Sequence, residues 1–190
     1  MLGAASEKNH GELPMTTIDI NILPRIQLDL SKMKNACEIK GIMKKLAIKD
    51  YCYAFMHNNI VMKFGQSGDN DWMRGSYGER IYRQARFIPG WPTLAAAGSA
   101  GCDMAALAEK FPNIDKNDVS IQVWDMTNVA FSVATDHRHE LTIVENELIA
   151  MHIKAFGHQP LGNIKDQSYI TKKTRVTDQV FNSLFDVVDN

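Results

Sequence analysis

The chain has 190 residues, of which 45% are hydrophobic and 23% charged, and its formal net charge is −1. This composition is typical of a soluble globular protein, most simply one domain with a terminal extension. It excludes a membrane span, which needs about 18 consecutive apolar residues, and a disulfide framework, because the three cysteines are scattered and odd in number. Residues 1–10 lack a basic region followed by an apolar core, so we expect a cytoplasmic protein with reduced thiols.

The elements follow from hydrophobic spacing and from turn signals along the chain. Ser31 is expected to cap a helix, Asn58-Asn59 to form a tight hairpin turn, and Gly157 to end a long helix. In chain order we predict an edge strand or extended arm over 18–30, a helix over 31–49, strands over 51–56 and 60–66, a short helix over 79–87, a helix over 103–110, strands over 120–126 and 130–134, a long helix over 138–156 and a last helix over 176–187.

This order predicts an α/β fold of the α+β kind, in which helices flank a small, mainly antiparallel sheet of about three strands. Three regions are expected: an N-terminal arm and helix over 1–49 for DNA contact or dimerisation, a core over 50–165, and a C-terminal extension over 166–190. The chain contains no internal repeat and no low-complexity tract that would favour another architecture.

Positive charge gathers in three segments although the net charge is near zero. These segments lie in the predicted helix over 31–49, in residues 74–86 and in residues 165–175. Such runs are either ordinary solvated faces or, where they flank one site, contacts for nucleic-acid phosphates. The residues expected to contact DNA are Lys40, Lys44, Lys45, Arg83, Lys172, Lys173 and Arg175.

Tyr53 and Lys63 lie on the two strands of the predicted hairpin. Tyr53, beside Tyr51 and Phe55, either fills the core or points its hydroxyl into a cleft as a proton acceptor. Lys63 either extends to solvent or serves as a phosphate contact or proton relay. A strict two-residue loop would pair residues 53 and 64 and leave Lys63 on the opposite face from Tyr53. The two side chains can therefore act together only if the hairpin contains an odd-numbered loop or a bulge.

Arg80 begins a predicted helix and is either an ordinary exposed arginine or one that binds a phosphate. On the wheel of the long helix over 138–156, Glu145 and His152 fall within the apolar arc. A carboxylate in such an arc must pair with a cation or bind a metal ion, so both readings of Glu145 stay open. His152 is expected to be a core histidine with its hydrogen bonds satisfied.

Two further patterns carry little weight. Asp136–Glu140 resembles a metal cluster, but no second ligand set at zinc spacing accompanies it. Gly98–Gly101 resembles a phosphate loop, but the Gly-Lys-Ser/Thr ending is absent, so a simple turn is expected.

Five short motifs occur in one order within residues 50–165. They are Tyr51-Cys52-Tyr53, Lys63-Phe64-Gly65-Gln66-Ser67, Glu79-Arg80-Ile81-Tyr82, Val144-Glu145-Asn146-Glu147-Leu148-Ile149 and Pro160-Leu161-Gly162-Asn163. In order and spacing the chain resembles the GIY-YIG nuclease superfamily, in which two strands carry tyrosines, a helix begins with an arginine and a later helix supplies a metal-binding glutamate. Lys63 stands at the place of the second tyrosine, which makes the chain most similar to the small GIY-YIG type II restriction endonucleases.

The resemblance implies a DNA endonuclease that hydrolyses phosphodiester bonds with Mg²⁺ or Mn²⁺, one ion per active site. Tyr53 would orient or deprotonate the attacking water, and Lys63 would assist it by lowering the pKa of the phenol. Arg80 would stabilise charge on the phosphate, Glu145 would hold the ion, and Asn163 would support the site through hydrogen bonds.

The chain departs from the family pattern near the arginine. The family often has histidine or tyrosine four residues after it, where this chain has Gln84, and Tyr82 or Tyr77 are candidates for that role. Arg74 is a rival of Arg80, because residues are inserted between Gly65 and Arg80.

The resemblance also implies double-stranded DNA as a partner, a homodimer that acts on a symmetric site, and room for a cognate methyltransferase that acts on the same DNA. We expect no membrane association. Three alternatives stay open: a structure-selective repair or mobile-element nuclease, a non-catalytic nucleic-acid-binding module, and a structural or interaction protein without a DNA role.

Overall fold

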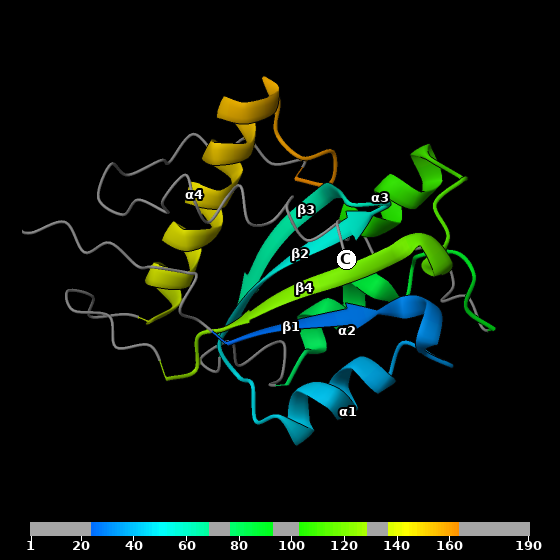
Figure 1. Cartoon of the computed structure of the whole chain (residues 1–190), viewed down its shortest axis with the longest axis horizontal. Coiled ribbons are helices and arrows are strands. Elements are labelled where there is room, and N and C mark those ends of the chain that lie inside the picture. Colours follow the sequence, from blue (N-terminus) through cyan, green and yellow to red (C-terminus); the bar gives the residue numbers. More distant parts are fainter. Residues whose placement is uncertain (1–23, 69–76, 93–102, 129–136, 164–190) are drawn as a thin grey trace, which may run out of the picture.

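The computed structural model describes residues 24–68, 77–92, 103–128 and 137–163. Within these ranges a four-stranded antiparallel sheet lies between two layers of helices (Figure 1). Its strands β1 (Arg25–Asp29), β2 (Tyr51–His57), β3 (Ile60–Ser67) and β4 (Val119–Asp125) have the spatial order β1-β4-β2-β3. The helices are α1 (Glu38–Lys45), α2 (Glu79–Ala85), α3 (Asp103–Lys110) and α4 (His137–Phe156), with short 3₁₀ helices η2 (Leu30–Lys32) and η3 (Lys116–Asp118). The α+β class is confirmed, with one strand more than expected because β1 pairs with β4.

The sheet separates two hydrophobic cores. The first lies against α1, α2 and α3 and contains Tyr53 and Ile121 of the sheet. The second lies against α4 and contains Cys52, Phe64 and Trp124. Neighbouring residues of a strand point to opposite faces, so Cys52 and Tyr53 belong to different cores. A site built from side chains of the sheet therefore lies on one of its faces or around its edges.

The β2–β3 hairpin turns at Asn58-Asn59, as predicted. Both asparagines have positive φ angles (47° and 66°), which a two-residue type I′ turn requires. The register then shifts by one residue, so that Phe55 pairs with Lys63 while Met62 is left as the extra residue of a β-bulge. The strict pairing of residues 53 and 64 does not occur.

The helix predicted over 31–49 is wrong at both ends, because α1 covers only Glu38–Lys45. Ser31 does not cap α1; instead its N–H donates to the Asp29 side chain, and the chain forms the 3₁₀ turn η2. The carbonyl oxygens of residues 30, 31 and 33 accept hydrogen bonds from the Lys116 ammonium, and α1 begins only at Glu38. Residues 28–43 contribute side chains to the first core, so this region packs with the rest of the described chain.

The remaining described elements agree closely with the prediction. Helix α3 has the predicted bounds, and α2, α4 and β4 begin or end within two residues of them. Gly157, with φ of 77°, follows the end of α4 in the left-handed conformation that glycine adopts easily. The strand predicted over 130–134 and the helix predicted over 176–187 lie outside the described residues. Within the described ranges, no helix is long and apolar enough to cross a bilayer.

Candidate functional site

The bulge turns Tyr53 and Lys63 to the same face of the sheet. Directly paired residues of antiparallel strands share a face, so Lys63 lies with Phe55, and Gly65 lies with Tyr53. Gly65 makes room for the Tyr53 ring, because a Cβ atom at this position would lie 2.3 Å from the Tyr53 hydroxyl oxygen. Tyr53 is 0% exposed and Lys63 is 3% exposed. The register that joint action of the two residues requires is therefore present.

Arg80 approaches this face from α2, beside Tyr51. Burial, and then the neighbouring Tyr53, raise the pKa of the Tyr51 phenol, whereas the Ser67 side chain and Arg80 lower it by a smaller amount. The rings of Tyr51 and Tyr53 are tilted by 46°, with centroids 6.1 Å apart. Side chains from β2, β3 and α2 thus meet on one face of the sheet.

Asn163 holds the segment after α4 against the free edge of β3. Its side-chain oxygen accepts from the Phe64 N–H at 2.9 Å, and its side-chain amide donates to the Phe64 carbonyl at 3.0 Å. The Gly162 N–H donates to the Met62 carbonyl at 2.7 Å. The Lys63 Nζ donates to the Gly162 carbonyl at 3.5 Å. The structure therefore gives Asn163 a supporting position and joins its segment to Lys63.

Glu145 belongs to α4, the helix that covers the other face of the sheet. It is half-buried and lies near Cys52. Burial raises the pKa of the Cys52 thiol, and the negative charge of Glu145 raises it further. The same thiol contacts the Leu141 carbonyl at 3.8 Å, one turn before Glu145. The structure thus gathers Tyr53, Lys63 and Arg80 on one face, while Glu145 comes from the helix across the sheet.

His152 is a core histidine, as predicted. Its Nδ1 lies 2.8 Å from the His158 carbonyl oxygen, and its ring stands edge-on to Phe64 with centroids 6.4 Å apart. Burial lowers the pKa of His152, and the hydrogen bond to the His158 carbonyl offsets this only in part. Within the described ranges, no group of three or more His, Cys, Asp or Glu residues could hold a metal ion.

The secondary candidates have positions of their own. Gln84 is buried, and its side-chain oxygen accepts from the Met104 N–H at 3.0 Å, so it caps the start of α3. Tyr82 has the Lys40 ammonium 4.3 Å from its ring centroid. Tyr77 adopts a positive φ of 59° and precedes Gly78, the N-cap residue of α2. Arg74 lies outside the described residues.

Two of the residues expected to contact DNA are joined by Glu79. Its carboxylate pairs with Lys40 of α1 at 3.2 Å and with Arg83 of α2 at 2.9 Å. Desolvation would raise the pKa of Glu79, but hydrogen bonds from Arg83 and Lys40 outweigh it and the net pKa is lowered. Lys44 and Lys45 are exposed on α1, and the candidates Lys172, Lys173 and Arg175 lie outside the described residues.

Sequence reasoning missed Glu79 and Lys116. The spacing of Glu79 and Arg83, four residues apart on a predicted helix, would have indicated their ion pair. Lys116 stands in the polar run 115–118, which looks like an ordinary loop and gives no such signal.

Compared with known proteins, the chain matches no family model, no curated protein and no solved structure.

Proposed function

We propose that this protein is a Mg²⁺-dependent DNA endonuclease that hydrolyses phosphodiester bonds, most simply a site-specific enzyme of the restriction type. The observation that carries the proposal is the bulge at Met62, because it turns Lys63 to the face of Tyr53. Arg80 approaches the same face. A phenol, an ammonium and a guanidinium together suit a reaction in which a phosphate is held while an oxygen attacks it. The GIY-YIG resemblance supplies the reaction class.

In this proposal each residue has one role. Tyr53 orients the attacking water or accepts its proton, and Lys63, on the same face of the sheet, assists it. Arg80 stabilises the negative charge that grows on the phosphate as the new phosphorus–oxygen bond forms and the bond to the leaving oxygen breaks. Asn163 keeps the segment beside Lys63 in position through its two bonds to Phe64.

Glu145 is the residue that would hold the ion. Mg²⁺ prefers oxygen ligands and commonly binds through one or two carboxylates together with substrate phosphates and water. One half-buried carboxylate therefore fits an ion that arrives with its DNA substrate. Such an ion supplies charge stabilisation at the phosphate.

Double-stranded DNA is the proposed partner, and the lysines of α1 with Arg83 are its proposed phosphate contacts. A symmetric recognition site would be cut by a homodimer. The enzyme would act in the cytoplasm, and a cognate methyltransferase would modify the same DNA. A repair or mobile-element nuclease would share the site residues. Discrete fragments from one plasmid favour the restriction role, and preferential cutting of branched or damaged DNA favours the other.

The deciding experiment is Mg²⁺-dependent cleavage of plasmid DNA by the wild type and by Tyr53→Phe, Lys63→Met and Glu145→Gln. Each variant should cut about 10²–10³-fold more slowly, while still binding DNA. Glu109→Gln and Lys110→Met, exposed on α3, are matched controls that should cut normally.

Other outcomes would overturn the proposal. Near wild-type cleavage by Glu145→Gln would contradict the role of that residue. Wild-type protein that binds DNA without breaking strands would be a non-catalytic module, and protein without salt-dependent retention on DNA would have no DNA role.

A further inference from the structure

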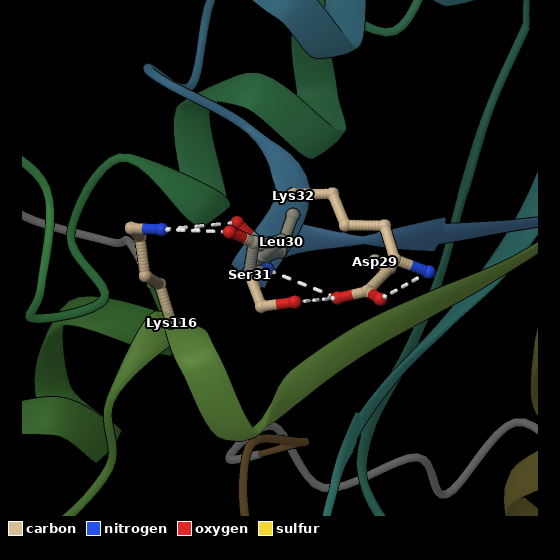
Figure 2. Close-up of polar contacts among 5 residues, drawn as sticks. All are labelled: Asp29, Leu30, Ser31, Lys32 and Lys116. Carbon is tan, nitrogen blue, oxygen red and sulfur yellow. Dashed lines mark hydrogen bonds and ion pairs between the residues drawn. The ribbon is translucent and has the colours of Figure 1, made fainter.

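Lys116 is a buried lysine whose ammonium is surrounded by oxygen atoms of the chain. The residue is 8% exposed. Its Nζ donates to the carbonyl oxygens of Leu30 at 3.2 Å, Ser31 at 3.5 Å and Met33 at 3.3 Å, and to the Asn117 side-chain oxygen at 3.4 Å. Figure 2 shows the first two of these contacts. We call these four oxygen atoms the Lys116 cage; none of them belongs to a carboxylate.

An aromatic ring lies beside the same ammonium. The Lys116 Nζ lies 5.2 Å from the centroid of the Trp91 ring, within the range of a cation–π contact. The Trp91 Nε1 in turn donates to the Ala85 carbonyl at 2.9 Å, at the end of α2. The backbone N–H of Lys116 donates to the Pro89 carbonyl at 2.8 Å. Lys116 therefore joins three segments: the turn before α1, the end of α2 and the start of η3.

Lys32, also drawn in Figure 2, is an ordinary exposed lysine and can be compared with the buried Lys116. It pairs with Asp29 at 3.0 Å, and its side chain is 81% exposed. An exposed pair of this kind contributes little to stability, because water solvates both charges well. A buried ammonium is different, since it loses its hydration and must regain hydrogen bonds from the protein. In other proteins, backbone carbonyl oxygens replace the lost hydration shell of a buried monovalent cation.

We propose that the Lys116 cage is a cation site that the chain fills with its own ammonium, and that this ammonium holds α1 in place against α2. The cage takes its backbone oxygens from residues 30, 31 and 33, which the short connection over residues 34–37 joins to α1. Helix α1 carries Lys40, which pairs with Glu79 at the start of α2. The inference does not depend on the proposed nuclease function.

A shortened side chain turns the inference into a binding test. Lys116→Ala removes three methylene carbons and the ammonium, which together correspond to one n-propylammonium ion. The variant should melt on the order of 5–10 °C below the wild type, because several charge-assisted hydrogen bonds are lost. n-Propylammonium at about ten times its Kd should raise the melting temperature of Lys116→Ala by about 3 °C or more.

Three controls separate the cage from general effects. Tetramethylammonium has no N–H donor and should not restore Lys116→Ala. Lys32→Ala should melt within about 2 °C of the wild type and should not respond to n-propylammonium. Lys116→Met keeps an apolar stem without the charge, so it should be destabilised but not restored. In Lys116→Met, hydrogen exchange should show a larger loss of protection in α1 than in α4.

The proposal is overturned if Lys116→Ala melts within about 2 °C of the wild type. It is equally overturned if n-propylammonium stabilises Lys116→Ala and Lys32→Ala to the same extent. Should Lys116→Ala not fold alone, its refolding yield decides the question. Recovery of folded protein with n-propylammonium, but not with tetramethylammonium, supports the cage, and no recovery with either contradicts it.

Discussion

Replacing Asn163 by leucine tests how strongly the segment after α4 is fixed to the sheet. Leucine has a similar size but forms no hydrogen bonds. The change removes the partners of the Phe64 N–H and carbonyl, which Asn163 satisfies at 2.9 Å and 3.0 Å. Phe64 is fully buried, so these two groups would be left without partners in an apolar environment. The loss should therefore exceed that of an ordinary surface change.

The magnitude follows from the number of orphaned groups. A buried donor or acceptor without a partner costs about 1–3 kcal/mol. Two such groups lower the free energy of unfolding by about 2–6 kcal/mol, which in a domain of this size is a fall in melting temperature of at least about 4 °C. Equilibrium unfolding in urea measures this difference from the shift of the midpoint at constant slope.

An exposed asparagine provides the control. Asn113 lies in the loop after α3, and Asn113→Leu should change the free energy of unfolding by no more than about 0.5 kcal/mol. If Asn163→Leu is destabilised by less than about 1 kcal/mol, the two bonds to Phe64 do not fix the edge of β3 as argued. The supporting role of Asn163 beside Lys63 would then be untenable as well.

Two further outcomes are expected. Burial lowers the pKa of His152, so the stability it contributes is present above its ordinary value of 6.5 and is lost as pH falls through the lowered pKa. His152→Gln should remove this dependence from urea midpoints measured across the range, and an unchanged profile would refute it. Under the proposed function, Glu79→Gln should raise DNA affinity more than the control Glu38→Gln and give a steeper salt dependence, because Glu79 holds two cations; equal effects would refute this.

Elements with local signals could be predicted from the sequence. The hairpin turn needed two residues that tolerate positive φ, and Asn58-Asn59 supplies them. Helix α4 places the buried residues Leu141, Val144, Leu148 and Met151 at helical spacing and ends before Gly157. The start of α1 could not be predicted, because residues 30–32 form η2, and the carbonyls of Leu30 and Met33 accept hydrogen bonds from Lys116, more than 80 residues away in the sequence. A tertiary contact of this kind overrides the capping preference of Ser31.

The candidate site was predictable only in part for a similar reason. From the sequence we could infer that Tyr53 and Lys63 share a face only if the hairpin contains an odd-numbered loop or a bulge. The position of the bulge could not be inferred. The extra residue of the bulge is Met62, and a methionine in a strand gives no indication of a bulge, unlike a glycine or a proline. The role of Gln84 was also hidden, since its hydrogen bond reaches the start of α3, which is adjacent only in space.

Under the proposed function, the sheet restricts where Glu145 and Arg80 could contact one phosphate. Arg80 reaches the Tyr51 end of β2 on one face, and Tyr51 pairs there with Ser67, the last residue of β3. On the other face, α4 approaches the same end, because a Cβ atom at Gly68 would lie 3.0 Å from the Leu141 side chain. Glu145 lies one turn after Leu141. Since β3 is an edge strand, groups from both faces can meet around this end of it, whereas the hairpin turn lies at the opposite end of both strands. Under the proposed function, a catalytic site that uses both residues would therefore form where β3 ends, and DNA would approach the sheet from that end.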